Sequence, residues 1–261
     1  MADPAEVSLS VASGIGTIAL DRPKANAYTV DLLQRLLDTV DAADGSADAR
    51  VVLIRSALPR FFCAGADVKA FEANSTETNH RLVELARAVV ARIESSGKLF
   101  VAVIQGHALG GGLELAMGCD LRWAAAGEYL LGLPEVKLGL IPGNGGCVRL
   151  PRLIGPSRAL DMLATGRSVM PDEAAAMGLV DRLIPADGFD DEVAGQAQTL
   201  ASAAPLAVAA IKRYLRESQG LGLDDSLALE TRCVEPLYDS ADAAEGLAAF
   251  VEKREARFTG A

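Results

Sequence analysis

The chain has 261 residues, of which 50% are hydrophobic and 23% are charged, so its composition is that of a folded globular protein. With 25 basic and 35 acidic residues the formal net charge is −10, which argues against nucleic acid or an anionic membrane as a partner. No apolar stretch approaches the ~18–20 residues that span a membrane. Residues 1–6 show no start of a signal peptide, and the four cysteines are far apart, so we expect a cytoplasmic protein with reduced thiols and no metal site.

The first two thirds of the chain alternate predicted strands and helices. Apolar runs predict strands at residues 7–13, 15–20, 51–54, 100–104, 121–124 and 179–184. Helical spacing of apolar residues predicts helices at residues 30–40, with Thr29 as the N-cap, at 80–93 and at 113–117. Strands that alternate with helices pair in parallel, so the sequence predicts an α/β fold.

The last third is almost entirely helical in pattern. Four helices are predicted, at residues 189–203, 205–218, 224–238 and 241–258. We therefore divide the chain into an α/β core over residues 1–188, which carries the candidate site, and a helical region over residues 189–261. The helical region is expected to pack on this core or on a neighbouring subunit.

Two glycine-containing corners follow predicted buried strands. The first spans residues 61–69 and includes Gly65, and the second spans residues 106–114 and includes three consecutive glycines, 110–112. Ligands bind at the carboxyl ends of strands in α/β sheets, where glycine lets a ligand approach backbone N–H groups. One such corner alone is more simply a tight turn, but two facing corners could hold an oxyanion between two N–H groups.

Two glutamates lie in apolar surroundings close to these corners. Glu114 follows the glycines directly, and Glu135 lies 21 residues later between Pro134 and Val136. A single such glutamate is more often an ion-pair partner or a helix cap. Two of them beside candidate ligand corners favour acid and base catalysis, because burial raises a carboxyl pKa toward neutrality. His107 and Cys63 lack an evident catalytic partner, so we assign them structural roles.

Several motifs, in order, resemble those of the enoyl-CoA hydratase (crotonase) family over nearly the whole chain. They are DRPKANA at residues 21–27, AGADVK at 64–69, ALGGGLELA at 108–116, LPEVKLG at 133–139, IPG at 141–143 and the segment 245–254. The resemblance implies a spiral core of ββα repeats, with a C-terminal helical region that builds homotrimers, often paired as hexamers. It also implies an acyl-CoA thioester as ligand and no separate cofactor, because coenzyme A is carried by the substrate.

The resemblance further assigns roles to individual residues. The N–H groups of Ala66 and Gly111 would form the oxyanion hole for the thioester carbonyl. Contacts to the coenzyme A moiety would come from Lys24, Ala25, Asn26, Ala64, Ala66, Asp67, Val68, Lys69 and Gly111, and from Lys253 toward a neighbouring subunit. Glu114 would act as the base on water, Glu135 would deliver a proton, and the Gly143 N–H would help position the water and a carboxylate.

Because both glutamates are present, the resemblance favours an enoyl-CoA hydratase of fatty acid β-oxidation, which adds water to a trans-2-enoyl-CoA. The alternatives are another reaction on an acyl-CoA, namely double-bond isomerisation or a specialised dehydration such as that of carnitinyl-CoA, and a non-catalytic acyl-CoA-binding or RNA-binding relative. The chain departs from the usual family pattern in three places. The stretch at residues 22–27 is one residue shorter than in many family members, and the interval from Glu114 to Glu135 is one residue longer than usual. Asn144 replaces a more usual alanine. Together with Tyr28 and residues 70–79, which would shape the acyl pocket, these departures leave the acyl group open.

Overall fold

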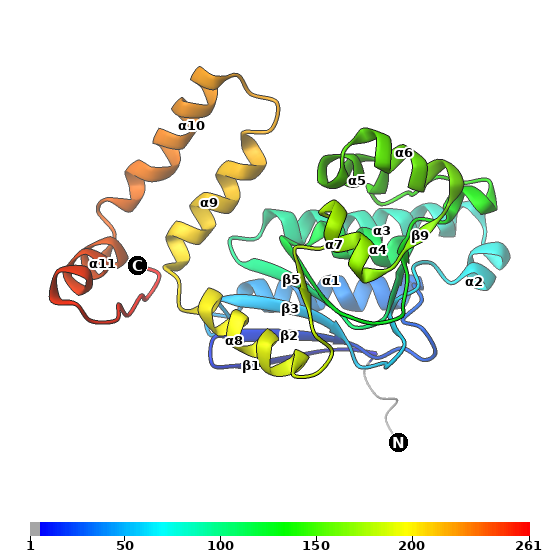
Figure 1. Cartoon of the computed structure of the whole chain (residues 1–261), viewed down its shortest axis with the longest axis horizontal. Helices are drawn as coiled ribbons and strands as arrows, with labels where there is room; N and C mark the ends of the chain where they lie inside the picture. Colours follow the sequence, from blue (N-terminus) through cyan, green and yellow to red (C-terminus); the bar gives the residue numbers. More distant parts are fainter. Residues whose placement is uncertain (1–5) are drawn as a thin grey trace.

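The computed structural model describes residues 6–261, and its main layer is a six-stranded sheet (Figure 1). The strand order is β1-β2-β3-β5-β7-β10, in which β1 and β2 pair antiparallel and every other neighbouring pair is parallel. The strands are β1 (Val7–Ala12), β2 (Ile15–Leu20), β3 (Val51–Ser56), β5 (Leu99–Ile104), β7 (Leu121–Ala125) and β10 (Arg182–Ile184). The predicted α/β class with parallel pairing is therefore confirmed.

A second, separate sheet consists of four very short strands and carries the candidate site. Its order is β4-β6-β8-β9, from β4 (Phe61–Cys63), β6 (His107–Leu109), β8 (Leu131–Gly132) and β9 (Ser168–Val169). Strands β4, β6 and β8 run parallel, so their carboxyl ends lie at one edge. The two glycine-containing corners leave the sheet at this edge.

Helices cover both faces of the main sheet. On one face α1 (Val30–Gly45) and α3 (Thr76–Ser95) pack with the larger apolar core, and on the other α8 (Phe189–Ala201) packs against a second cluster that includes Trp123. Thr29 caps α1 as predicted, since its Oγ1 accepts a hydrogen bond from the Leu32 N–H. The remaining helices of the core are α2 (Val68–Ala73), α4 (Gly111–Gly118), α5 (Gly146–Ile154), α6 (Pro156–Thr165), α7 (Pro171–Met177) and the 3-10 helix η1 (Glu135–Leu138).

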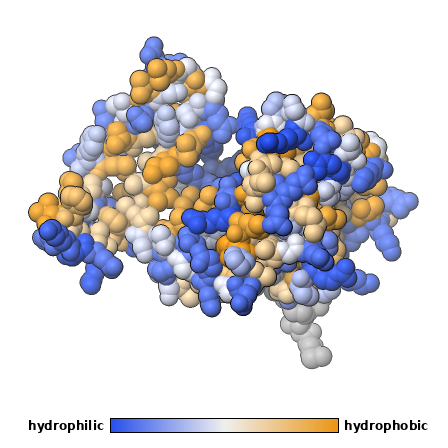
Figure 2. Space-filling view, viewed as in Figure 1, coloured by the Kyte–Doolittle hydropathy of each residue, from blue (hydrophilic) through white to orange (hydrophobic). Residues whose placement is uncertain are grey.

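The C-terminal helices extend away from this core in Figure 1. They are α9 (Pro205–Glu217), α10 (Leu223–Val234), the 3-10 helix η2 (Glu235–Leu237) and α11 (Ala241–Glu252). Figure 2 shows apolar side chains at the surface of this arm. The division of the chain at residue 188 stays a prediction. None of the helices within residues 6–261 combines the length and apolarity that crossing a membrane requires.

The predicted last helix is wrong in its end, because α11 stops at Glu252 rather than near residue 258. Lys253 adopts a left-handed conformation with φ of 55° and turns the chain back. The Asp242 carboxylate, at the start of the same helix, accepts hydrogen bonds from the N–H groups of Thr259 and Gly260. These bonds satisfy the backbone N–H groups of the segment after the helix, so this segment needs no helical hydrogen bonds there.

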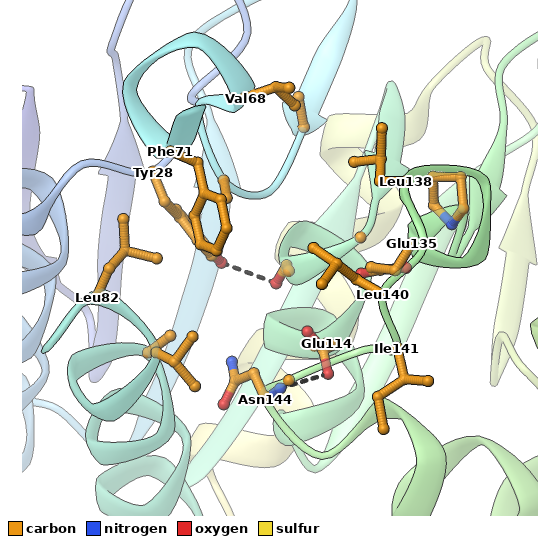
Figure 3. Close-up of a pocket in the computed structure, with 18 residues that line it drawn as sticks. Tyr28, Val68, Phe71, Leu82, Glu114, Glu135, Leu138, Leu140, Ile141 and Asn144 are labelled. Atoms are coloured by element: carbon orange, nitrogen blue, oxygen red, sulfur yellow. Dashed lines mark hydrogen bonds between the residues drawn. The ribbon is translucent and has the colours of Figure 1, made fainter. Parts of the chain in front are cut away.

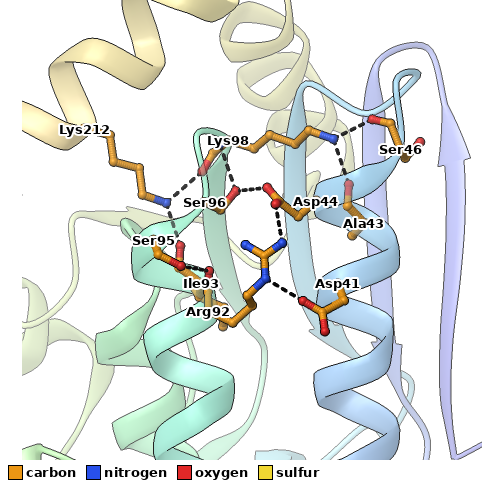
Figure 4. Close-up of polar contacts among 10 residues, drawn as sticks. All are labelled: Asp41, Ala43, Asp44, Ser46, Arg92, Ile93, Ser95, Ser96, Lys98 and Lys212. Carbon is orange, nitrogen blue, oxygen red and sulfur yellow. Dashed lines mark hydrogen bonds and ion pairs between the residues drawn. The ribbon is translucent and has the colours of Figure 1, made fainter. Parts of the chain in front are cut away.

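A buried lysine joins the arm to the core (Figure 4). Lys212 of α9 donates hydrogen bonds of 2.8 Å to the carbonyls of Ile93 and Lys98 and to the carboxylate of Asp120. The Ile93 carbonyl lies at the C-terminal end of α3, where the helix dipole favours a cation. Burial raises the pKa of Asp120, and the neighbouring Lys212 opposes this rise.

Candidate active site

The two glycine-containing corners lie against each other. A Cβ atom added to Gly65 would lie 2.7 Å from the Gly111 nitrogen, and Gly65 has a φ of +79°, so only glycine fits there. Tyr28 holds both corners, since its N–H donates to the Gly65 carbonyl and its hydroxyl donates to the Gly111 carbonyl. This contact fixes the distance between Ala66 and Gly111.

The backbone N–H groups of Ala66 and Gly111 are free to bind a ligand. Neither donates a hydrogen bond to any of residues 6–261, whereas the adjacent Asp67 N–H is used by the Tyr28 carbonyl. Gly111 is the first residue of α4, where the N–H groups have no partner inside the helix. Both residues line the same cavity, so their N–H groups could converge on one negatively charged oxygen.

That cavity has a volume of about 290 Å³ and is shown in Figure 3. Its lining is largely apolar, and among the described residues that line it there is no lysine, arginine or histidine. The lining residues are Tyr28, Ala64, Ala66, Val68, Phe71, Leu82, Val83, Ala86, Gly110, Gly111, Glu114, Pro134, Glu135, Leu138, Leu140, Ile141, Gly143 and Asn144. Such a cavity suits an acyl chain, with Glu114 and Glu135 as its two ionisable acids.

Glu114 comes from the first turn of α4 and is only 3% exposed. Its Oε1 accepts hydrogen bonds of 2.7 Å from the backbone N–H groups of Asn144 and Gly146. Burial raises the pKa of Glu114 above its ordinary value, although these two N–H groups and the charges of Arg149 and Arg87 oppose the rise. One carboxylate oxygen is therefore held by backbone, and in Figure 3 the other points away from Asn144.

Two arginines hold the loop that carries these N–H groups. Arg87 of α3 donates to the Gly143 carbonyl at 2.7 Å, and Arg149 of α5 donates to the Asn144 carbonyl at 3.0 Å. Arg149 is itself fixed by an ion pair of 2.8 Å with Glu94. The arginines thus act on Glu114 both through the loop and through their positive charge.

Glu135 is the first residue of η1 and lines the same cavity as Glu114 (Figure 3). Burial, with a smaller contribution from the Glu114 charge, raises the pKa of Glu135 to about 7. Its Oε2 is buried without a hydrogen-bond partner among residues 6–261. A Cβ atom at Gly110 would lie 3.0 Å from the Glu135 Oε1, so the glycine leaves room for this carboxyl group. At neutral pH Glu135 can therefore carry a proton that it can donate.

Comparison with known proteins agrees with this geometry. The family model for enoyl-CoA hydratase/isomerase matches residues 10–261. The chain belongs to this family. It is 38% identical over 261 residues to a probable enoyl-CoA hydratase of Bacillus subtilis, covering 97% of this chain and 98% of that protein. It is 36% identical over 252 residues to the human mitochondrial methylglutaconyl-CoA hydratase, covering 95% and 74% of the two chains.

Solved structures give the same result for the fold. The crystal structure of an enoyl-CoA hydratase from Geobacillus kaustophilus superposes with a TM-score of 0.94 at 34% identity, covering 99% of this chain and 98% of that one. The fold is thus the crotonase fold, and the chain is an enzyme of the hydratase type.

Of the residues expected to bind coenzyme A, some line the cavity and others lie outside it. Ala64, Ala66, Val68 and Gly111 line the cavity. Ala25 lies next to this group, because its carbonyl accepts a hydrogen bond from the Ala64 N–H.

The charged residues of the set lie elsewhere. Lys24 and Lys69 are exposed outside the cavity lining, and Lys253 lies at the end of α11 in the C-terminal arm (Figure 1). The Asp67 carboxylate caps α2 by accepting from the Ala70 N–H. Contacts of these four residues with coenzyme A stay predictions.

Asn26 has a supporting position in the structure, and its contact with coenzyme A stays a prediction. Its side chain is fully buried and donates to the Phe62 carbonyl and to the Ser56 hydroxyl, while its Oδ1 accepts from the Arg22 N–H. Through these bonds the Asn26 side chain stabilises the first corner.

The loop after Ile141 binds Glu114 through its backbone. Gly143 lines the cavity, and the N–H groups that bind Glu114 belong to Asn144 and Gly146. The expected role of the Gly143 N–H in positioning water stays a prediction. Gly145 has a φ of +94°, and this turn aims both N–H groups at the carboxylate. Only the run of glycines before a helix could have indicated this arrangement in the sequence.

Proposed function

We propose that this enzyme is an enoyl-CoA hydratase that adds water reversibly to a trans-2-enoyl-CoA and gives a 3-hydroxyacyl-CoA. The observation that carries the proposal is that Glu114 and Glu135 line one apolar cavity together with the free N–H groups of Ala66 and Gly111. These are the groups that the addition of water to an α,β-unsaturated thioester requires.

In the proposed reaction the thioester oxygen accepts hydrogen bonds from the Ala66 and Gly111 N–H groups. Glu114, in its ionised form, takes a proton from a water molecule whose oxygen bonds to C3 of the substrate. The electrons of the double bond move toward the thioester, and the resulting enolate charge is stabilised by the two N–H groups. Glu135, in its protonated form, helps to hold the water and delivers a proton to C2, so that one water molecule is added in total.

The different surroundings of the two carboxyl groups support these opposite roles. Glu114 accepts two backbone hydrogen bonds and is near two arginine charges, all of which favour its ionised form. At Glu135 a hydrogen bond from its own backbone N–H lowers the pKa, but burial together with the charge of Glu114 outweighs this bond and favours the protonated form. Burial raises the pKa of both groups, but more partners oppose this rise at Glu114, which supports Glu114 as the base and Glu135 as the acid.

The test measures the loss of enoyl-thioester absorbance with crotonyl-CoA for the wild type, Glu114→Gln and Glu135→Gln. We expect turnover by the wild type and a fall of about 10²–10⁴ in each variant, which is the usual contribution of a general acid or base. The alternatives are a double-bond isomerase and a dehydratase for a specialised acyl group. Binding of crotonyl-CoA without turnover, with conversion of a trans-3-enoyl-CoA, would favour the isomerase.

We also propose a homotrimer, or a hexamer formed by two trimers, as the working form. Support comes from large apolar side chains that are exposed to solvent on α9 and α11 of a single chain (Figure 2). Among them are Leu215, Leu247, Phe250 and Val251. In such an assembly Lys253 would approach the coenzyme A bound by a neighbouring copy. Analytical ultracentrifugation tests the assembly, and a raised KM for Lys253→Ala tests the contact.

A further inference from the structure

One polar side chain of the cavity has no role in the mechanism above. Asn144 is 5% exposed, lines the cavity, and its Oδ1 is buried without a hydrogen-bond partner among residues 6–261. Figure 3 places it beside Glu114, at the end of the cavity opposite Tyr28 and Phe71. Buried polar atoms are nearly always paired in folded proteins, so an unpaired amide in a ligand cavity indicates a partner on the ligand.

The support that Asn144 gives to Glu114 does not involve this side chain. Its backbone N–H donates to the Glu114 Oε1, and its backbone carbonyl accepts from Arg149. Alanine could make both contacts equally well. The amide group is therefore available for a different task, and its position on the cavity wall points to the acyl part of the substrate.

The charges around the cavity select the kind of group that the amide can bind. The described lining contains two glutamates and no cationic side chain, so a carboxylate on the acyl chain would enter without a counter-ion. Arg149 is paired with Glu94, and Arg87 and Arg149 bond the Gly143 and Asn144 carbonyls without lining the cavity. A neutral hydroxyl group can both donate and accept a hydrogen bond with an amide, and it brings no unpaired charge into the cavity.

We propose that Asn144 forms a polar subsite for a hydroxyl group carried by the acyl chain beyond the reacting double bond. The inference rests on the proposed function for its placement of the acyl chain in this cavity. It predicts that the enzyme favours a hydroxylated enoyl-CoA over one that carries a carboxylate in the same place.

The test compares wild type, Asn144→Ala and the similarly sized Asn144→Leu on three substrates of equal chain length. These are trans-2-pentenoyl-CoA, 5-hydroxy-trans-2-pentenoyl-CoA and glutaconyl-CoA, which ends in a carboxylate. We expect both variants to lower the ratio of kcat/KM for the hydroxylated over the plain substrate by about tenfold, as for one lost hydrogen bond. Equal losses on all three substrates, or an unchanged ratio, would overturn the proposal.

A binding measurement separates this inference from the proposed function. Calorimetry with valeryl-CoA and 5-hydroxyvaleryl-CoA, which cannot be hydrated, reads the subsite without turnover. If the wild type hydrates no enoyl-CoA but prefers 5-hydroxyvaleryl-CoA, and Asn144→Ala removes this preference, the reaction is wrong and the subsite stands. If the wild type binds both esters equally, the subsite is wrong whatever the turnover.

Discussion

The roles proposed for the two glutamates, with Glu114 ionised and Glu135 protonated, predict a particular pH dependence of kcat/KM. Glu114 must be ionised and Glu135 protonated, so kcat/KM should rise with pH as Glu114 ionises and fall again as Glu135 loses its proton. With a pKa of about 7, Glu135 is about 90% protonated at pH 6 and about 10% protonated at pH 8. The rate should therefore fall roughly tenfold between these two values.

The two glutamine variants separate the two limbs of this profile. Glu135→Gln removes the proposed proton donor, so its residual activity should show no fall between pH 6 and pH 8. Glu114→Gln removes a negative charge that raises the pKa of Glu135, so its residual alkaline limb should move to lower pH. Initial rates with subsaturating crotonyl-CoA in constant-ionic-strength buffers from pH 5 to pH 9 measure both effects. An alkaline limb that persists in Glu135→Gln, or one that moves to higher pH in Glu114→Gln, would refute the assignment.

Three further variants test the surroundings of the site and the fold. Arg149→Ala removes a charge that lowers the pKa of Glu114, so the acid limb of the profile should move to higher pH, while Arg149→Lys should leave it nearer the wild type. Gly110→Ala would place a carbon 3.0 Å from the Glu135 Oε1 at a φ of +53°, and crotonyl-CoA turnover should fall by about 10². A normal rate would show that Glu135 tolerates displacement. Lys212→Met leaves Asp120 buried without its cation and should lower the free energy of unfolding by roughly 3–5 kcal/mol at pH 7. Urea unfolding should show a smaller loss at pH 4, because burial raises the pKa of Asp120 and favours its protonated form, and the exposed Lys137→Met is the control.

Much of the fold could be predicted because its signals are local. The apolar run at residues 51–54 is a central strand, and Thr29 caps a helix that begins at Val30. The helices α5 and α6 escaped prediction, since Pro151 lies inside α5 and Pro156 begins α6, and proline normally indicates a break. The two-residue strands β8 and β9 exist only through pairing with each other and with β6, which no local pattern reports.

The site likewise has features that the sequence predicts and features that it does not. The glycine corners and the two apolar-flanked glutamates are visible in the sequence, because each needs a particular residue type at a particular place. The partners of Glu114 depend on how the loop turns at Gly145, which is a property of the folded backbone. The full burial of Asn26 depends on contacts with Ser56 and Phe62, more than 29 residues away, so its supporting position could not be predicted.

The backbone attachment of Glu114 also bears on how this enzyme can evolve. Because main-chain N–H groups hold the carboxylate, mutation of residue 144 can exchange one side chain for another while Glu114, the proposed base, keeps its two hydrogen bonds. Gly145 and Gly146 have no such freedom, since a Cβ at either would meet Arg149, Leu133 or the Glu114 carboxylate itself. Residue 144 is thus a position at which new substrate ranges can arise by single mutations, and a natural first target for libraries that seek altered acyl selectivity.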